Sequence, residues 1–94
     1  MIIGVVMNDM LVFGGGYKGS KRITRFGPGE QIELASHPVQ AARVEVYQPI
    51  SYKFSLYSFS HDDGNEYLIA LHGDEPDADL IKECIFRERP EPFK

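Results

Sequence analysis

Glycines near the start of the chain have the spacing of a phosphate-binding motif. Gly14, Gly16 and Gly19 satisfy G-x-G-x-x-G, but a dinucleotide fold needs a helix after these glycines. Residues 23–26 are strand-like instead, so we expect no such fold. An alternative function remains, in which a basic glycine-rich loop over residues 14–22 holds a phosphate-bearing small molecule such as a nucleotide. This candidate ligand site comprises Gly16, Tyr17, Lys18, Gly19, Ser20, Lys21, Arg22 and Arg25.

The same stretch has residue types that contact nucleic acids. Between Tyr17 and Phe26 there are four cations and no acids, and both of these end residues are aromatic and suited to base stacking. The whole chain, however, carries a formal net charge of −4, and affinity for phosphates depends on accumulated positive charge. The composition therefore disfavours direct nucleic-acid binding.

A second charged segment, residues 61–83, is strongly acidic. It contains eight acidic residues against the single base Lys82, a formal charge of −7. Such a segment favours docking onto a basic protein, for example as an inhibitor that occupies a nucleic-acid-handling partner. The competing interpretation is local, because hairpin tips are solvated and helix starts attract acids. The predicted partner-binding residues are Asp62, Asp63, Glu66, Asp74, Glu75, Asp77 and Asp79.

The remaining reactive residue types form no pattern that predicts catalysis. His61 and His72 stand at opposite ends of one predicted strand, about 20 Å apart, too far to share a metal ion. Cys84 lies on an apolar helix stripe and is expected to be a core residue. No G-x-S-x-G motif is present. We therefore expect a non-enzymatic binding protein with no metal and no cofactor.

Length and composition limit what can position these residues. The chain has 94 residues, of which 43% are hydrophobic and 26% charged, which supports one core and excludes large catalytic barrels. We expect a single β-rich domain over residues 1–89 and a C-terminal tail over 90–94, to which Phe93 is a candidate anchor. The apolar runs are too short for a membrane span. A single cysteine in so small a domain favours a cytoplasmic location.

Alternating and β-branched segments predict most of the strands. An N-terminal hairpin is expected from Ile2–Met7 and Met10–Phe13, with its turn at Asn8-Asp9. Further strands are expected at Ile23–Phe26, Gln31–Leu34, Ala42–Tyr47, Tyr52–Ser60 and Tyr67–Leu71.

The second half of the chain gives finer predictions. The apolar phase of the strand over 52–60 changes near Leu56-Tyr57, which we interpret as a β-bulge; without a bulge, both of its faces need cover. The next turn is centred on Asp63-Gly64, which places His61 opposite Glu66. Residues 67–71 are apolar throughout, as in a central strand buried on both faces.

The last element is predicted to be a helix over Pro76–Glu88. Its apolar stripe is Leu80, Ile81, Cys84 and Ile85. The fold class is then α+β and mostly β: an antiparallel sheet, small barrel or sandwich of six to seven strands, with this helix packed on it. Since one helix does not cover a whole sheet, a homodimer is a further expectation.

Overall fold

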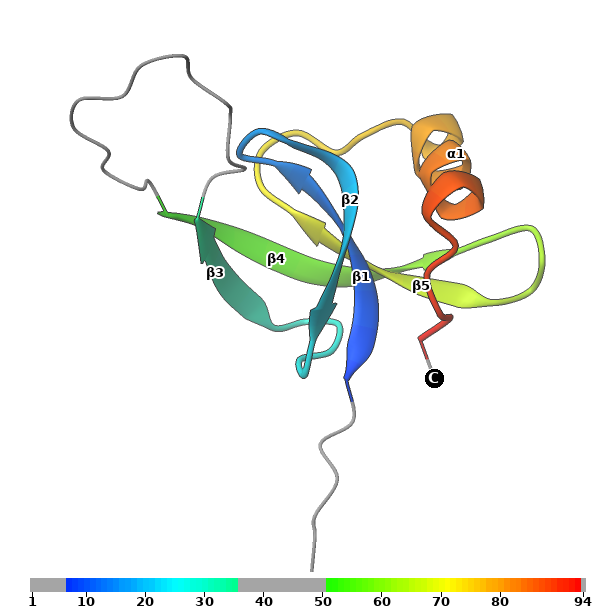
Figure 1. Cartoon of the computed structure of the whole chain (residues 1–94), viewed down its shortest axis with the longest axis horizontal. Coiled ribbons are helices and arrows are strands. Elements are labelled where there is room, and N and C mark those ends of the chain that lie inside the picture. The colour runs from blue at the N-terminus through cyan, green and yellow to red at the C-terminus, as the bar shows by residue number, and fades with distance from the viewer. Residues whose placement is uncertain (1–6, 36–50, 94) are drawn as a thin grey trace, which may run out of the picture.

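The structure is a computed structural model that describes residues 7–35 and 51–93. Within them the chain forms five strands and one helix (Figure 1). They are β1 (Asn8–Gly14), β2 (Tyr17–Thr24), β3 (Gln31–Ala35), β4 (Ser51–Ser60), β5 (Glu66–Leu71) and α1 (Ala78–Glu88). The β-rich class with one C-terminal helix is confirmed, whereas six to seven strands were predicted. The predicted strand over 42–47 lies outside the described residues, as does the segment over 2–6.

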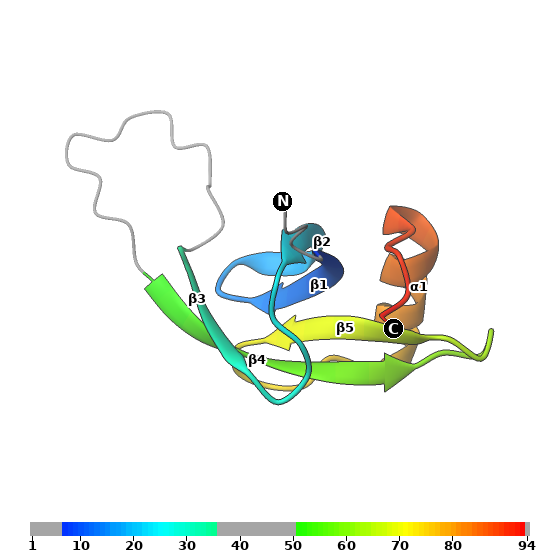
Figure 2. The ribbon, with the colours of Figure 1, turned by 90° about the horizontal axis from the view of Figure 1, so that it is seen from below.

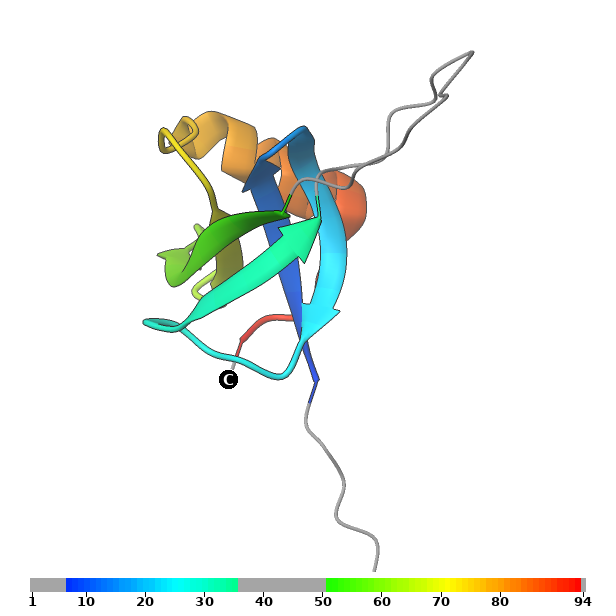
Figure 3. The ribbon, with the colours of Figure 1, turned by 90° about the vertical axis from the view of Figure 1, so that its left-hand side faces the viewer.

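The strands form one mixed sheet in the order β2-β1-β5-β4-β3. β1 and β5 are parallel neighbours, so the prediction of a wholly antiparallel sheet is wrong. The sheet curls into a half-barrel that brings the two edge strands, β2 and β3, toward each other (Figures 2 and 3). The Tyr17 hydroxyl spans this approach, donating a hydrogen bond of 2.9 Å to the backbone carbonyl of Ala35.

The predicted N-terminal hairpin is wrong, because its expected turn and its second strand have other roles in the fold. Asn8 and Asp9 do not form a turn but begin β1, which pairs with the strand that follows it, β2. The reversal takes place at Gly15 and Gly16, whose φ angles of +57° and +90° suit a two-residue type I′ turn. Residues 14–22 therefore belong to a regular β-hairpin, because glycines adopt these φ values without strain.

A bulge does occur in the sheet, but in β2 and not in β4. The register passes from Val12↔Ser20 to Phe13↔Lys18 and leaves Gly19 unpaired. β4, in contrast, keeps an unbroken register with both of its neighbours, so the predicted bulge at Leu56-Tyr57 is wrong. The phase change along β4 has another cause, which is that the covered face changes along the strand: Phe54 and Leu56 are buried in the concave cluster, and Tyr57 and Phe59 pack against the helix-side cluster.

Two clusters of side chains make up the core, one on each face of the sheet. The concave cluster lies inside the curl, and the helix-side cluster lies between the sheet and α1. β5 contributes to both, as predicted for a strand buried on two faces. The buried members are Met10, Val12, Tyr17, Phe54, Leu56, Leu68 and Ala70 in the concave cluster, and Leu11, Phe13, Tyr67, Ile69, Ile81, Cys84 and Ile85 in the helix-side cluster.

The curl of the sheet buries its own concave face. A second copy of the chain is therefore not required to bury that face. The homodimer stays a prediction without that support.

The helix begins two residues later than predicted, with Asp77 at its N-cap. Ile81, Cys84 and Ile85 are buried as expected, but Leu80 is 42% exposed, so the predicted stripe is one residue too wide. Beyond the helix, the Phe93 backbone N–H donates to the Glu66 carbonyl at 2.7 Å. The Phe93 ring also packs against the concave cluster, so it anchors the C-terminal segment to the sheet.

Candidate functional site

The acidic residues of segment 61–83 lie on three neighbouring parts of the fold. They occupy the β4–β5 hairpin and the start of β5, the connection from β5 to α1, and the first two turns of α1. All eight are exposed. We call them the acidic surface: Asp62, Asp63, Glu66, Asp74, Glu75, Asp77, Asp79 and Glu83.

One ion pair connects the hairpin tip to the helix. The Lys82 ammonium lies 3.2 Å from an Asp62 carboxylate oxygen, and the two elements lie side by side at the right of Figure 1. Exposed pairs of this kind contribute about 0–1 kcal/mol, so the pair positions the tip more than it stabilises the fold. It also neutralises only one of the eight carboxylates.

The hairpin tip differs in register from the prediction. Ser60, and not His61, lies opposite Glu66. His61 instead exchanges backbone bonds across the turn, donating to Asn65 at 2.9 Å and accepting from Gly64 at 3.0 Å. Gly64 has a φ of +84°, which suits the left-handed position of a three-residue hairpin loop.

Hydrogen bonds hold the Asp63 carboxylate in place at this tip. Tyr67 donates its hydroxyl to one oxygen at 2.7 Å, and the Asn65 backbone N–H donates to the other at 2.9 Å. The bond from Tyr67 is the main cause of a lowered Asp63 pKa, followed by that from Asn65. The same bond raises the pKa of Tyr67. The carboxylate therefore stays charged to a lower pH than an ordinary aspartate does.

Tyr67→Phe is expected to bring the pKa of Asp63 back toward its usual value near 3.8, because it removes the strongest bond to the carboxylate. In the wild type, a lowered folded-state pKa means that the unfolded chain takes up this proton first. The contribution of the Asp63 carboxylate to stability is therefore complete above its pKa in the unfolded chain. It is lost as the pH falls through its pKa in the folded chain. NMR titration of the Asp63 side-chain carboxyl measures this, with Tyr57→Phe as control. An unchanged Asp63 pKa in Tyr67→Phe contradicts the assignment.

The start of α1 carries acids for a local electrostatic reason as well. Asp77 is the N-cap residue but forms no side-chain capping bond, and Asp79 lies in the first turn, where a carboxylate favours the helix dipole. Nearby, burial raises the pKa of Tyr57, with a further contribution from the negative charge of Glu75. Both Asp77 and Asp79 are exposed, so their carboxylates are available to a partner.

The residues of the basic stretch are divided between the two faces of β2. Lys21 lies opposite Leu11 and Lys18 opposite Phe13, so both lysines are on the helix side of the sheet. Arg22 lies opposite Met10, on the concave side. The stretch therefore does not gather its cations at one point.

Tyr17, the predicted base-stacking residue, is part of the core and only 6% exposed. Its ring meets Phe54 edge-on, with centroids 6.0 Å apart, and the Arg22 guanidinium lies 5.5 Å from its centroid. The ring face that a base would need is thus engaged by this chain's own side chains. Of the other predicted ligand residues, Gly19 is buried in the bulge, Ser20 is half-buried, and Gly16 and Arg25 are exposed.

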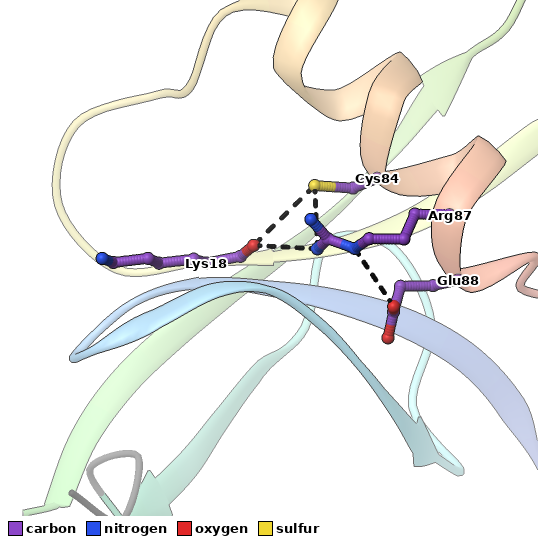
Figure 4. A network of polar contacts seen from close by, with 4 residues as sticks. All are labelled: Lys18, Cys84, Arg87 and Glu88. Atoms are coloured by element: carbon purple, nitrogen blue, oxygen red, sulfur yellow. Dashed lines mark hydrogen bonds and ion pairs between the residues drawn. The ribbon is translucent and has the colours of Figure 1, made fainter.

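Cys84 joins α1 to β2 through a small polar network (Figure 4). Its thiol lies 3.8 Å from the Lys18 carbonyl, to which the Arg87 guanidinium also donates at 3.3 Å. Burial raises the pKa of the Cys84 thiol, and the charge of Arg87 opposes this only in part. As predicted, Cys84 is a core residue, and its thiol is neutral at physiological pH.

Within residues 7–35 and 51–93, no group of three or more histidine, cysteine or acidic side chains is arranged to hold a metal ion. The described residues enclose no detectable pocket. The His72 ring lies against Tyr52 at a tilt of 47°, with ring centroids 4.6 Å apart, and its Nδ1 lies 3.1 Å from the Lys53 carbonyl oxygen. No helix in this part of the chain is long and apolar enough to cross a membrane.

Comparison with protein-family models, with curated proteins and with solved structures finds no match to this chain. Functional inference therefore depends on the surface itself. One surface residue was missed by the sequence analysis: Phe86 on α1 is 77% exposed. Its place outside the buried stripe was readable from the helical spacing, but its significance depends on what surrounds it.

Proposed function

We propose that this chain is a small non-enzymatic binding protein that docks onto a basic protein surface through its acidic surface. In the form we favour, it is an inhibitor that occupies a nucleic-acid-handling partner. The observation that carries the proposal is the exposure of all eight carboxylates between residues 61 and 83. Only one of these carboxylates is paired with a cation in the part of the chain that the structure describes.

The electrostatics favour a role in association. Uncompensated carboxylates on adjacent elements produce a field that extends about 10 Å at moderate ionic strength. Such a field accelerates the encounter with a cationic partner and suppresses contacts with acidic ones. A partner that binds nucleic acid already has a basic surface shaped for phosphates, which makes it the natural target for a small acidic competitor.

Replacing Asp74, Asp77 and Asp79 together by asparagine is expected to slow association about tenfold at low ionic strength and to flatten its salt dependence. Asparagine keeps the size of the side chain and remains a good N-cap at position 77, so the fold is retained. The partner is first captured from the native host and identified, and its binding is then measured by surface plasmon resonance over a salt series.

The matched control is Glu30→Gln, Glu33→Gln and Glu91→Gln combined, which removes three exposed carboxylates outside the acidic surface. It changes the net charge by the same amount. If the control and the triple aspartate variant slow association equally, net charge alone is responsible and the acidic surface is not the docking site.

The alternative function, binding of a phosphate-bearing small molecule by residues 14–22, has less support. Its cations lie on both faces of β2, and its aromatic residue Tyr17 is buried. Isothermal calorimetry against a panel of nucleotides distinguishes the two proposals. Saturable heat that disappears in a Lys18→Ala, Lys21→Ala and Arg22→Ala variant would establish the alternative.

A further inference from the structure

The two outer strands of the sheet, β2 and β3, each have an edge with no strand beside it in the described part of the chain. A free edge presents a row of unpaired backbone N–H and C=O groups, which is a template for pairing with another strand. The curl of the sheet turns these two edges toward each other (Figure 3). One added strand between them would therefore meet both edges.

The pairing of β1 identifies the free groups of β2. The Phe13 carbonyl accepts a backbone hydrogen bond of 3.0 Å from the residue that follows β5, so Phe13 faces β5. Because this orientation alternates along a strand, Leu11 and Asp9 also face β5. Their partners in β2 are Lys21 and Ile23, whose N–H and C=O groups therefore point away from β1. Both of these residues are exposed.

The same alternation identifies the free groups of β3. The Glu30 carbonyl accepts from a backbone N–H of β4 at 2.9 Å, so Glu30 faces β4. Gln31 and Glu33 therefore point their N–H and C=O groups into the other direction, away from the sheet, at every second position. The Ala35 carbonyl, at the next outward position, accepts the Tyr17 hydroxyl of β2, which agrees with this assignment.

The two edges lie too far apart to pair with each other. Paired strands are about 4.8 Å apart, so a strand added between two others needs about twice that distance. In the described part of the chain no backbone hydrogen bond joins β2 to β3. The Tyr17 side chain connects them instead, through its hydrogen bond of 2.9 Å. An intervening strand would supply the backbone partners that both edges lack.

We infer that β2 and β3 bind an extended segment of a partner protein between their free edges, and that apolar residues alternate with acidic ones in this segment. Side chains of an added strand point alternately to the two faces of the sheet. Those on the concave face meet Ile32 and Leu34, which are half-buried against the concave cluster, so these positions favour apolar residues. This site is separate from the acidic surface and does not depend on the proposed function.

The charges around the edges favour acidic residues at the other positions. Residues 17–35 contain four cations and two carboxylates, namely Lys18, Lys21, Arg22, Arg25, Glu30 and Glu33. The positions opposite them on β1 and β4 add one charge of each sign, Asp9 and Lys53. The Arg87–Glu88 ion pair of α1, close to the Lys18 carbonyl, is neutral. The surroundings of the two edges are thus net positive, which favours a segment with carboxylates.

A second copy of the folded chain does not fit this place. A strand between β2 and β3 uses both of its own edges, whereas every strand of the described sheet already has at least one neighbour. Pairing of two β2 edges about a two-fold axis is opposed as well. The antiparallel register that uses Lys21 and Ile23 of both copies places Arg22 directly opposite Arg22, and like charges at such positions are destabilising.

The test uses a defined probe, a short fluorescein-labelled peptide in which valine alternates with glutamate. Hydrogen exchange of the full chain, followed by NMR, reports on the edges directly. The amides of Lys21, Ile23, Gln31 and Glu33 should exchange rapidly in the free protein and about tenfold more slowly with saturating peptide. A peptide of the same composition with its valines and glutamates in two blocks should leave these amides unprotected.

Ile23→Pro removes an outward N–H of β2 but no hydrogen bond to β1, so it is compatible with an edge strand. It should weaken peptide binding about tenfold relative to Ile23→Ala, the matched control that loses the same side chain but keeps the N–H. Glu33→Pro and Glu33→Ala make the same comparison on β3. Fluorescence anisotropy gives the affinities. Peptides N-methylated at alternate residues test the same bonds in the unaltered protein, and each should also bind about tenfold more weakly.

Equal affinities of the proline and alanine variants at either position would overturn the inference, as would equal binding of a peptide with lysine in place of glutamate. Protection of the four amides without peptide would overturn it too, because the edges are then already occupied. Protection that persists on dilution indicates another segment of the same chain, and protection that is lost on dilution indicates a second copy. The proposed function is judged separately, by the triple aspartate variant and its captured partner.

Discussion

Gly19→Ala is expected to lower the free energy of unfolding by about 2–5 kcal/mol. A Cβ atom at position 19 would lie 2.3 Å from the Cys84 sulfur and 3.0 Å from the Cys84 Cβ, so α1 must move away from β2. Overpacking of this kind costs about 1–3 kcal/mol. The φ of +90° adds about 1–2 kcal/mol for any residue with a side chain. Both costs apply at Gly19 because the bulge places its backbone next to Cys84 of α1.

Urea denaturation followed by circular dichroism measures this effect, and Gly29→Ala separates its two parts. Gly29 has nearly the same φ, +89°, but an added Cβ would meet nothing within 4 Å. This control should therefore cost only about 1–2 kcal/mol. Adding Cys84→Ala to Gly19→Ala removes the sulfur and should recover part of the loss. If Gly19→Ala costs no more than Gly29→Ala, the helix is not seated on the bulge as described.

Gly19 also illustrates why part of this fold was beyond sequence reasoning. The glycines and cations of residues 14–22 resemble phosphate-binding motifs, so the sequence alone predicts a ligand-binding flap at this place. Asn8-Asp9 and Gly15-Gly16 are both acceptable hairpin turns. Only the pairing of β1 with β5 and the packing of α1 decide between them, and those contacts are distant in sequence.

The elements predicted correctly are those whose signals are local. The helix was found from its acidic start, its apolar spacing and Pro90, and the burial of Tyr67–Leu71 on two faces followed from its uninterrupted apolar run. The phase change in β4 was ambiguous, because a bulge and two-sided cover produce the same alternation. β4 has no bulge; its concave face is buried at Phe54 and Leu56 and its other face is partly buried at Tyr57 and Phe59, so each face is covered along one half of the strand.

The candidate site was predictable in its charges but not in its shape. The acids of 61–83 can be counted from the sequence, and their exposure follows from hairpin and helix-start positions. The Lys82–Asp62 pair and the hydrogen bond from Tyr67 to Asp63 depend on side-chain placement across elements. The helical spacing alone places Phe86 outside the buried stripe, and the structure shows it to be exposed.

Phe54→Ala is expected to cost about 3–5 kcal/mol of stability, since deleting a buried phenylalanine leaves a cavity. Phe54 is completely buried, and its ring contacts Tyr17 and His72. Phe59→Ala, on the other face of β4, should cost about half as much, because the Phe59 ring is only partly buried and less apolar area returns to water. Chemical denaturation of both variants tests the comparison; equal losses would contradict the two-sided description of β4.

The same variant tests whether the two clusters unfold together. β1 and β5 contribute side chains to both, so a cavity on the concave side weakens strands that also support α1. We expect one transition, in which the helical signal and the aromatic near-ultraviolet signal are lost at the same urea concentration. Were the helical signal to persist after the aromatic signal had gone, α1 and the helix-side cluster would be independent of the half-barrel. The acidic surface, which spans the hairpin and α1, would then lack the single rigid support that joint unfolding implies.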